Sequence, residues 1–324
     1  MQTTTTTDST LRKVPTLSLG SYLYGSQDDK VKFIEQLFHG IKDYGFIILK
    51  DHEVSKELLL KAYQMLEQFY KLPNATKKSY ISEMGGGQRG YTAFGQEHAK
   101  GSPVMDLKEF WHVGREVPNG HAFEKYYPKN IWPDDSVAEF RNTFEQLYSQ
   151  LEIAGIQMME ALSYPLEVEK DYFAKMVVEG NSILRLLHYP PIPEGVDTRC
   201  VRAAEHEDIN FITILPAATT SGLQLKDRDG TWLDIESDFG SLIVDAGDML
   251  ARITNDVIPS TTHRVINPQD GKNNSRYSMP FFMHPHPESM LSCLASCRGS
   301  GAKYGDILAH GFLMQRLREI GLVK

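Results

Sequence analysis

Two histidines and one aspartate in the second half of the chain have the side chains needed to hold a metal ion. His206 and Asp208 stand two residues apart, and the residues that follow, 210–215, are rich in the β-branched and aromatic types typical of a strand. Side chains at positions i and i+2 of a strand point to the same face, so the imidazole and the carboxylate would project side by side. His263 lies further along, in another apolar, strand-like segment.

This set of residue types indicates a particular metal chemistry. Two histidines and one carboxylate on one face of an octahedron form the facial triad of non-haem Fe(II) oxygenases, which leaves three positions for O2 and substrates. A lone His-x-Asp is weak evidence, because most such triplets lie in surface loops or form ordinary core hydrogen bonds. The ordered set of His206, Asp208 and His263 favours an iron site over that alternative.

An Arg-x-Ser follows the second histidine. Arg276 and Ser278 would share one face of a strand, and Pro280, Phe282 and His284 would continue that face. Arginine offers a planar fork of donors that matches a carboxylate, and serine adds a hydroxyl donor. The pair predicts an acidic co-substrate whose far end is held away from the metal.

Further motifs carry a resemblance that extends over nearly the whole chain. In chain order they are residues 14–19, 44–49, 51–52, 89–91, 106–109, 189–191 and 304–308. Together with the histidines and the Arg-x-Ser, they resemble the isopenicillin N synthase-like branch of the iron(II)- and 2-oxoglutarate-dependent dioxygenases, which includes plant flavonoid and gibberellin oxygenases. The resemblance covers about residue 12 to residue 320.

The resemblance implies a fold, a reaction and a set of site residues. The fold is a distorted double-stranded β-helix with iron in its mouth. The reaction uses O2 to hydroxylate, desaturate or close a ring in a small-molecule metabolite, with release of succinate and CO2. The implied ligands are His206, Asp208 and His263 for Fe(II), and Arg276, Ser278 and Tyr189 for 2-oxoglutarate.

Two other functions stay open. Many plant members have asparagine two residues before the tyrosine, where this chain has Leu187. The leucine removes a polar partner of the co-substrate, and it favours an iron-dependent oxidase of the isopenicillin N synthase type that uses no 2-oxoglutarate. A non-catalytic jelly-roll binding protein is the third alternative. Counting succinate formed per substrate consumed would separate the 2-oxoglutarate-dependent dioxygenase from the oxidase.

Composition limits the classes of partner and the cellular compartment that we expect for this chain. The chain has 324 residues, 41% hydrophobic content and a net charge of −8, with no basic block, so neither nucleic acid nor an anionic membrane is expected as a partner. The start is polar, and no run of about 18 apolar residues occurs. The three cysteines, Cys200, Cys293 and Cys297, are expected to be free thiols, which fits a cytoplasmic location.

The first half of the chain shows mainly helical periodicity. Residues 1–11 are expected to be a disordered tail, and helices are expected at 28–44, after Ser55, at 134–163 and at 167–176. The spacing in 134–163 could form a coiled-coil seam, but the back of a core lying across a sheet is favoured in a single globular chain. Residues 82–105, with Gly85, Gly86 and Gly87, are predicted to be a flexible loop near the mouth of the site rather than a phosphate-binding loop.

From Ile183 onward the pattern is that of short strands separated by turns. Some eight strands over about 105 residues indicate a double-sheet jelly roll, and Asp229-Gly230 predicts a hairpin. We therefore expect an α+β fold with a mainly β, cupin-like core flanked by helices. Its expected regions are a helix and strand region at 12–180, a jelly-roll catalytic core at 181–290 and a C-terminal helical segment at 291–324, packed as one compact unit.

The substrate itself stays open, because loops that the sequence does not place form the pocket walls. Phe282 shares the face of Arg276 and Ser278 and is the first candidate for a wall residue. Weaker candidates are Leu223, Phe110 and Trp111, and Arg89 and Tyr91 are expected at the mouth. His188, His284 and His286 are expected to pack or to form hydrogen bonds rather than to bind metal.

Overall fold

Two β-sheets face each other in the computed structural model, which describes residues 12–82, 88–98 and 103–319. The strands of the larger sheet are β1 Thr16–Ser18, β2 Phe46–Lys50, β3 Gly90–Thr92, β4 Glu109–Gly114, β5 Ile183–Tyr189, β7 Ile212–Pro216, β10 Leu242–Ala246, β12 Arg276–Ser278 and β13 Phe281–Met283. The strands of the smaller sheet are β6 Ala203–His206, β8 Leu223–Lys226, β9 Trp232–Asp234 and β11 His263–Val265. This is the predicted double-stranded β-helix.

The order of the strands mixes both halves of the chain. Within the described residues, the larger sheet runs β1-β2-β10-β7-β13-β5-β4-β3, with β12 also paired to β5, and the smaller sheet runs β6-β11-β8-β9. Strands β1 to β4 therefore extend the sheet that carries β5, β7 and β10. The predicted hairpin is present, since β8 and β9 pair antiparallel on either side of Asp229-Gly230.

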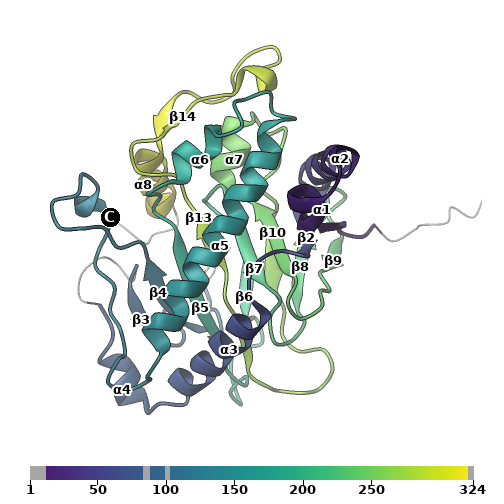
Figure 1. Cartoon of the computed structure of the whole chain (residues 1–324). Helices are drawn as coiled ribbons and strands as arrows, with labels where there is room; N and C mark the ends of the chain where they lie inside the picture. The colour runs from purple at the N-terminus through teal and green to yellow at the C-terminus, as the bar shows by residue number, and fades with distance from the viewer. Residues whose placement is uncertain (1–11, 83–87, 99–102, 320–324) are drawn as a thin grey trace, which may run out of the picture.

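Helices cover the outer face of the larger sheet. They are α1 Leu19–Tyr24, α2 Gln27–Tyr44, α3 Lys56–Tyr70, α4 Asn74–Lys78, α5 Phe140–Ser163 and α6 Tyr172–Val177. Helix α7, Asp248–Ile253, contacts β14, Met290–Leu291, and helix α8, Ala309–Glu319, contacts β15, Ile307–Leu308. The long helix α5 crosses in front of β4, β5 and β7 (Figure 1). Its residues Phe144, Leu151 and Met158 are fully buried in the main core cluster, so this helix forms the back of the core and not a coiled-coil seam.

Local signals fix the ends of the helices near the sheet. Ser26 caps α2 in a reciprocal capping box with Asp29, and Gly45 ends it with a φ of 69°. A side chain at Gly45 would also collide with Thr261, whose hydroxyl oxygen lies 2.0 Å from the position of a Cβ atom. Ser55 caps α3 as predicted, by accepting a hydrogen bond from the backbone of Leu58.

Three predicted helix boundaries are wrong. Helix α5 begins at Phe140 rather than 134, because Glu139 takes a left-handed conformation with a φ of 66°. The next helix begins at Tyr172 rather than 167, where Glu167 likewise has a φ of 55°. Within the segment 291–324, which was expected to be helical, the helix begins only at Ala309, because Ile307–Leu308 is strand β15, which pairs with β14, Met290–Leu291.

The packing of the helices and the two sheets forms two apolar layers. One lies between the helices and the larger sheet. The other fills the space between the two sheets, and it includes Phe46, Phe110 and Leu187 from the larger sheet and Leu223 and Val265 from the smaller one. The site residues lie beside this inner layer, in the space between the two sheets.

The described residues test some further expectations only in part or not at all. The expected tail, 1–11, and the glycine run at 85–87 lie outside the described residues. The three cysteines are free. Across the parts of the chain that the structure describes, no helix is long and apolar enough to cross a membrane.

A buried ion pair joins the helical layer to β4. Lys77 on α4 donates to both carboxylate oxygens of Glu109, at 3.0 and 2.8 Å, and both side chains are almost fully buried. Glu109 also accepts hydrogen bonds from Tyr91 and from His188 Nδ1. His188 is therefore a hydrogen-bonding residue on the helical side of the sheet, as expected.

We expect Glu109→Ala to destabilise the fold by about 3–5 kcal/mol, because it leaves the Lys77 cation buried without a partner. The measurement is chemical denaturation of the metal-free protein. The matched control is Glu67→Ala on α3, which breaks an exposed pair with Lys71 and should cost no more than about 0.5 kcal/mol. Equal losses in the two variants would contradict the role given to the buried pair.

Candidate metal and co-substrate site

The three predicted metal ligands come together at one end of the smaller sheet. His206 ends β6 and lies directly opposite His263 on β11. The carboxylate oxygen Oδ1 of Asp208 lies 3.9 Å from Nε2 of each histidine. One ligand atom from each residue falls within 4.8 Å of the other two, a spacing that fits one metal ion bound by all three.

The element that carries Asp208 differs from the one predicted. Residues 207–211 form a connection between β6 and β7, so Asp208 does not share a strand face with His206. The backbone N–H of Asp248 fixes the connection by donating to the carbonyl of Asp208 at 2.7 Å. Gly247 permits this close approach, because a Cβ atom there would lie 2.3 Å from the carbonyl oxygen of Asn210.

Hydrogen bonds orient both imidazole rings for metal binding. Nδ1 of His206 donates to the carbonyl of Ala204 at 2.7 Å, and Nδ1 of His263 donates to the carbonyl of Thr261 at 3.1 Å. Each bond places the proton on Nδ1 and leaves the lone pair of Nε2 toward the other ligands. Partial removal from water and the neighbouring His263 lower the pKa of His206, which favours the neutral ring that a metal needs.

Two residues that the sequence did not single out support Asp208. The hydroxyl of Thr213 on β7 donates to Oδ2 of Asp208. Asp245 on β10 lies opposite Thr213 in the sheet, and burial together with the charge of Asp208 raises the pKa of Asp245 well above its usual range. Asp245 is thus a second buried carboxyl close to the residue that supports Asp208.

The predicted acid-binding residues also lie together. Arg276 on β12 is opposite Tyr189 on β5, and Ser278 is opposite Leu187. The Arg276 guanidinium carbon lies 5.1 Å from the centre of the Tyr189 ring. Nε of Arg276 donates to the carbonyl of Thr220 at 3.1 Å, whereas Nη1 is buried with no partner in the described parts of the chain. A buried cation with an unused donor fits a bound carboxylate.

Leu187 contributes an apolar wall beside Ser278. It is buried in the inner layer and pairs with Phe110 on its other side. Phe282 continues the face of Arg276 and Ser278, since β13 keeps the same register on β5 and Phe282 lies opposite Thr213. Leu223 faces this layer from the smaller sheet.

Three weaker expectations are wrong. Trp111 is fully buried on the helical side of β4, with its ring centre 5.0 Å from that of Phe69. Tyr91, on β3, is opposite Trp111 and also points to the helical side. Arg89 is buried and donates to the carbonyl of Pro128. Alternation along β4 brings Phe110 to the site and takes Trp111 away from it.

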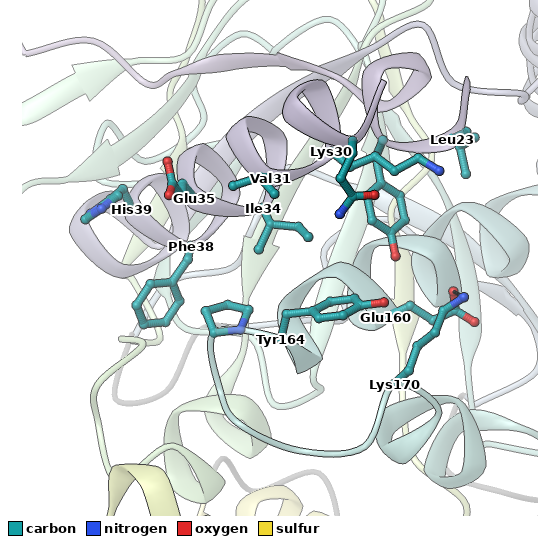
Figure 2. Close-up of a pocket in the computed structure, with 13 residues that line it drawn as sticks. Leu23, Lys30, Val31, Ile34, Glu35, Phe38, His39, Glu160, Tyr164 and Lys170 are labelled. Carbon is teal, nitrogen blue, oxygen red and sulfur yellow. Dashed lines mark ion pairs between the residues drawn. The ribbon is translucent and has the colours of Figure 1, made fainter. Parts of the chain in front are cut away.

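The hollow shown in Figure 2 is separate from these residues. It lies on the outside of the molecule between α2 and the end of α5, with Ile34 and Phe38 on one side and Tyr164 on the other. Charged side chains of both signs surround it, including the pair Lys170 and Glu160. None of the predicted site residues lines it, so we do not assign the oxidation chemistry to it.

Comparisons with known proteins agree with this architecture. Residues 14–135 match the family model of the non-haem dioxygenase in morphine synthesis N-terminal region, and residues 180–285 match that of the 2OG-Fe(II) oxygenase superfamily. The chain is 30% identical over 291 residues to the "2-oxoglutarate-Fe(II) type oxidoreductase hxnY" of Emericella nidulans. That match covers 86% of this chain and 82% of the relative.

Solved structures show the same fold. A 2OG-Fe(II) oxygenase family protein from Caulobacter crescentus is 41% identical, with a TM-score of 0.85, over 94% of this chain and 98% of the other. Full-length T7H from Neurospora crassa, in complex with alpha-KG, is 31% identical, with a TM-score of 0.84, over 94% and 95% of the two chains.

His284 gives a pH-dependent test of the interior beside the site. It is buried, its Nδ1 has no partner within the described residues, and burial lowers its pKa to about 4. A histidine buried in its neutral form stabilises the fold above its unfolded pKa of about 6.5, and that contribution is lost as pH falls toward 4. The loss amounts to about 3 kcal/mol.

We therefore expect the metal-free His284→Met variant to lose less stability than the unmodified protein when pH falls from 6.5 to 4. Urea denaturation across this range measures the difference. His39→Met, at an exposed position of α2, is the control. Parallel pH profiles for His284→Met and the unmodified protein would contradict the burial of a neutral His284.

Proposed function

Because the chain belongs to the 2OG-Fe(II) oxygenase superfamily and is an Fe(II)- and 2-oxoglutarate-dependent dioxygenase that oxidises a small molecule, we propose that His206, Asp208 and His263 are its iron ligands. The observation that carries this assignment is the approach of two Nε2 atoms and one carboxylate oxygen to within 4.8 Å of one another. Both histidines already use Nδ1 on backbone carbonyls, which prepares Nε2 for a metal.

We assign the hold on 2-oxoglutarate to Arg276, Ser278 and Tyr189. The free donor of Arg276 would pair with the far carboxylate, the hydroxyl of Ser278 would add a second donor, and the Tyr189 ring would keep the guanidinium in place. Leu187 offers this group no hydrogen bond. We therefore expect a grip that is functional but weaker than in relatives with asparagine at this position.

When bound, iron and 2-oxoglutarate supply the O2-dependent oxidation, with release of succinate and CO2. The chain's own residues hold and orient these groups. Thr213 fixes the second oxygen of Asp208, so that Oδ1 stays toward the histidines. Phe110, Phe282 and Leu223 would form apolar substrate walls and keep water out.

The names of the relatives support oxidation of a small molecule, but they point to different substrates. One curated relative is named a proline hydroxylase, and solved T7H structures contain thymine or 5-formyluracil. Co-crystallised alpha-KG in T7H favours 2-oxoglutarate use over the alternative of a 2-oxoglutarate-independent oxidase. We propose a free metabolite as substrate, with neither nucleic acid nor membrane as a partner, and a cytoplasmic location, which the three free cysteines support.

We also propose that residues 12–180, 181–290 and 291–324 form one unit rather than separable domains. Strands β2 and β4 from the first region pair with β10 and β5 from the second. From the last region, β15 pairs with β14, and Arg316 of α8 forms an ion pair with Asp248, which follows β10.

Asp208→Ala should lower Fe(II) affinity by more than 100-fold while the fold is kept, since losing a residue that only supports a ligand costs about 10–100-fold. Thr213→Val, which removes such a support, should fall within that lower range. Competition with a chelator under anaerobic conditions measures both. Asp238→Ala, at an exposed carboxylate paired with Lys50, is the matched control. Unchanged iron affinity in Asp208→Ala would refute the ligand assignment.

Arg276→Leu should weaken 2-oxoglutarate binding by about 10- to 150-fold, the value of a hydrogen bond to a charged group. Arg276→Lys should also be impaired, because lysine keeps the charge but not the planar fork. The measurement is titration of the anaerobic Fe(II) protein, followed by its metal-to-ligand charge-transfer band. Arg141→Leu, at an exposed arginine paired with Glu145, is the control.

Two results would count against this account. The absence of the band at millimolar 2-oxoglutarate in the unmodified protein would favour the oxidase that needs no co-substrate. A band that Arg276→Leu leaves unchanged would mean that other residues hold the acid.

A further inference from the structure

Arg185 is a cation between the two sheets that neither the metal nor the co-substrate assignment uses. It lies on β5 at the same face as Leu187 and Tyr189, because side chains alternate along a strand. Tyr189 lies opposite Arg276 on β12. The guanidinium of Arg185 therefore enters the space between the sheets, further along the strand from the residues that hold the acid.

Two aromatic rings lie close to this guanidinium. Its central carbon lies 4.5 Å from the centre of the Phe110 ring and 5.3 Å from that of Phe282. Phe282 is opposite Thr213, whose hydroxyl donates to Asp208. The group of Arg185, Phe110 and Phe282 is thus linked to the metal ligands through one neighbouring residue.

The hydrogen bonds of Arg185 leave part of its donor set unused. Nε donates to Nε2 of His112 at 2.6 Å, and Nη1 reaches both carboxylate oxygens of Glu97 only at 3.4 Å. Nη2 has no partner within the described ranges, and the side chain is 20% exposed. A guanidinium carries five N–H donors, so an acceptor brought by a ligand can still be bound.

Charge in this part of the cavity is already balanced. Lys108 Nζ lies 2.8 Å from Glu97 and 2.9 Å from Asp106. Together with Arg185, this group contains two cations and two carboxylates. Burial alone would raise the pKa of Glu97, but Arg185 and Lys108 hold it well below its usual range. Glu97 is therefore charged, and an additional carboxylate here would have no cation of its own.

We propose that Arg185 and Glu97 bind the substrate through a carbonyl group with an N–H beside it, on a flat, uncharged ring that packs against Phe110 and Phe282. Arg185 would donate to the carbonyl oxygen, and Glu97 would accept from the neighbouring N–H. Flat rings pack well against aromatic side chains. This substrate class, a lactam or cyclic imide, rests on the proposed function only in placing the substrate in the cavity of the iron site.

The test uses three small probes and isothermal titration calorimetry. 2-Pyridone has both the carbonyl and the N–H, N-methyl-2-pyridone lacks the N–H, and benzoate is an anion of similar size. Each is titrated into the full chain, both metal-free and loaded anaerobically with Fe(II) and 2-oxoglutarate. We expect 2-pyridone to bind at millimolar concentration and the other two to bind at least about 10-fold more weakly.

Variants then assign the binding to Arg185. Arg185→Gln should weaken 2-pyridone binding by about 10- to 150-fold, and Arg185→Lys should also weaken it, because lysine has no fork. Both variants should keep the 2-oxoglutarate charge-transfer band, which shows that they are folded. Arg199→Gln is the matched control, because Arg199 is exposed and pairs only with its neighbour Asp197.

The outcomes separate this inference from the proposed function. A normal charge-transfer band without 2-pyridone binding would overturn the inference and leave the iron and co-substrate assignments intact. Tighter binding of benzoate would show a site for anions, and equal binding of the N-methyl probe would remove Glu97 as an acceptor; either result overturns the proposed class. Arg185-dependent binding of 2-pyridone without a charge-transfer band would support the inference and refute the co-substrate assignment.

Discussion

The register of β5 against its neighbours is the constraint on which the cavity depends. In one continuous antiparallel pairing, Tyr189 is opposite Arg276, Leu187 is opposite Ser278, and Ile183 is opposite Phe282. A slip of one residue would turn every one of these side chains to the other face of the sheet. The acid-binding pair, the aromatic wall and Arg185 would then point into the helical layer. The buried contacts of His188 and Glu109 on that layer oppose such a slip, because they too would be lost.

The metal ligands depend on a second pairing and on a fixed connection. His263 and His206 face each other because β11 pairs with β6, and backbone carbonyls select the tautomer of each ring. Asp208 is placed by the backbone of Asp248 and by Thr213. The smaller sheet thus supplies two ligands, while the connection from β6 to β7, a strand of the larger sheet, supplies the third. A site at the junction of two sheets can hold its ligands rigidly and still remain open to substrates.

The sequence predicted the ligand types and the Arg-x-Ser pair because each leaves a short, local pattern. It predicted the jelly roll because short strands and turns recur over about 105 residues. It did not predict that Asp208 lies in a connection, since two residues of spacing are compatible with a strand or a loop. Trp111 was a candidate for a substrate wall and Tyr91 was expected at the mouth, yet both lie on the helical side. Alternation determines which residues share a face, but only the layers of the fold decide which face meets the cavity. Arg185 was missed for the same reason, because its role depends on Phe110 and Phe282, which are distant in sequence.

Charge balance links the two ends of the cavity. At the metal end, Fe(II) and Arg276 would bring three positive charges, and Asp208 with the two carboxylates of 2-oxoglutarate would bring three negative ones. Burial and the charge of Asp208 raise the pKa of Asp245, which works against a further negative charge at this end. At the other end, Arg185 and Lys108 are matched by Glu97 and Asp106. Charges in a low-dielectric interior are tolerated when each has a partner. A neutral substrate completes this cavity without disturbing either balance, whereas a charged one would have to bring or displace a counter-ion.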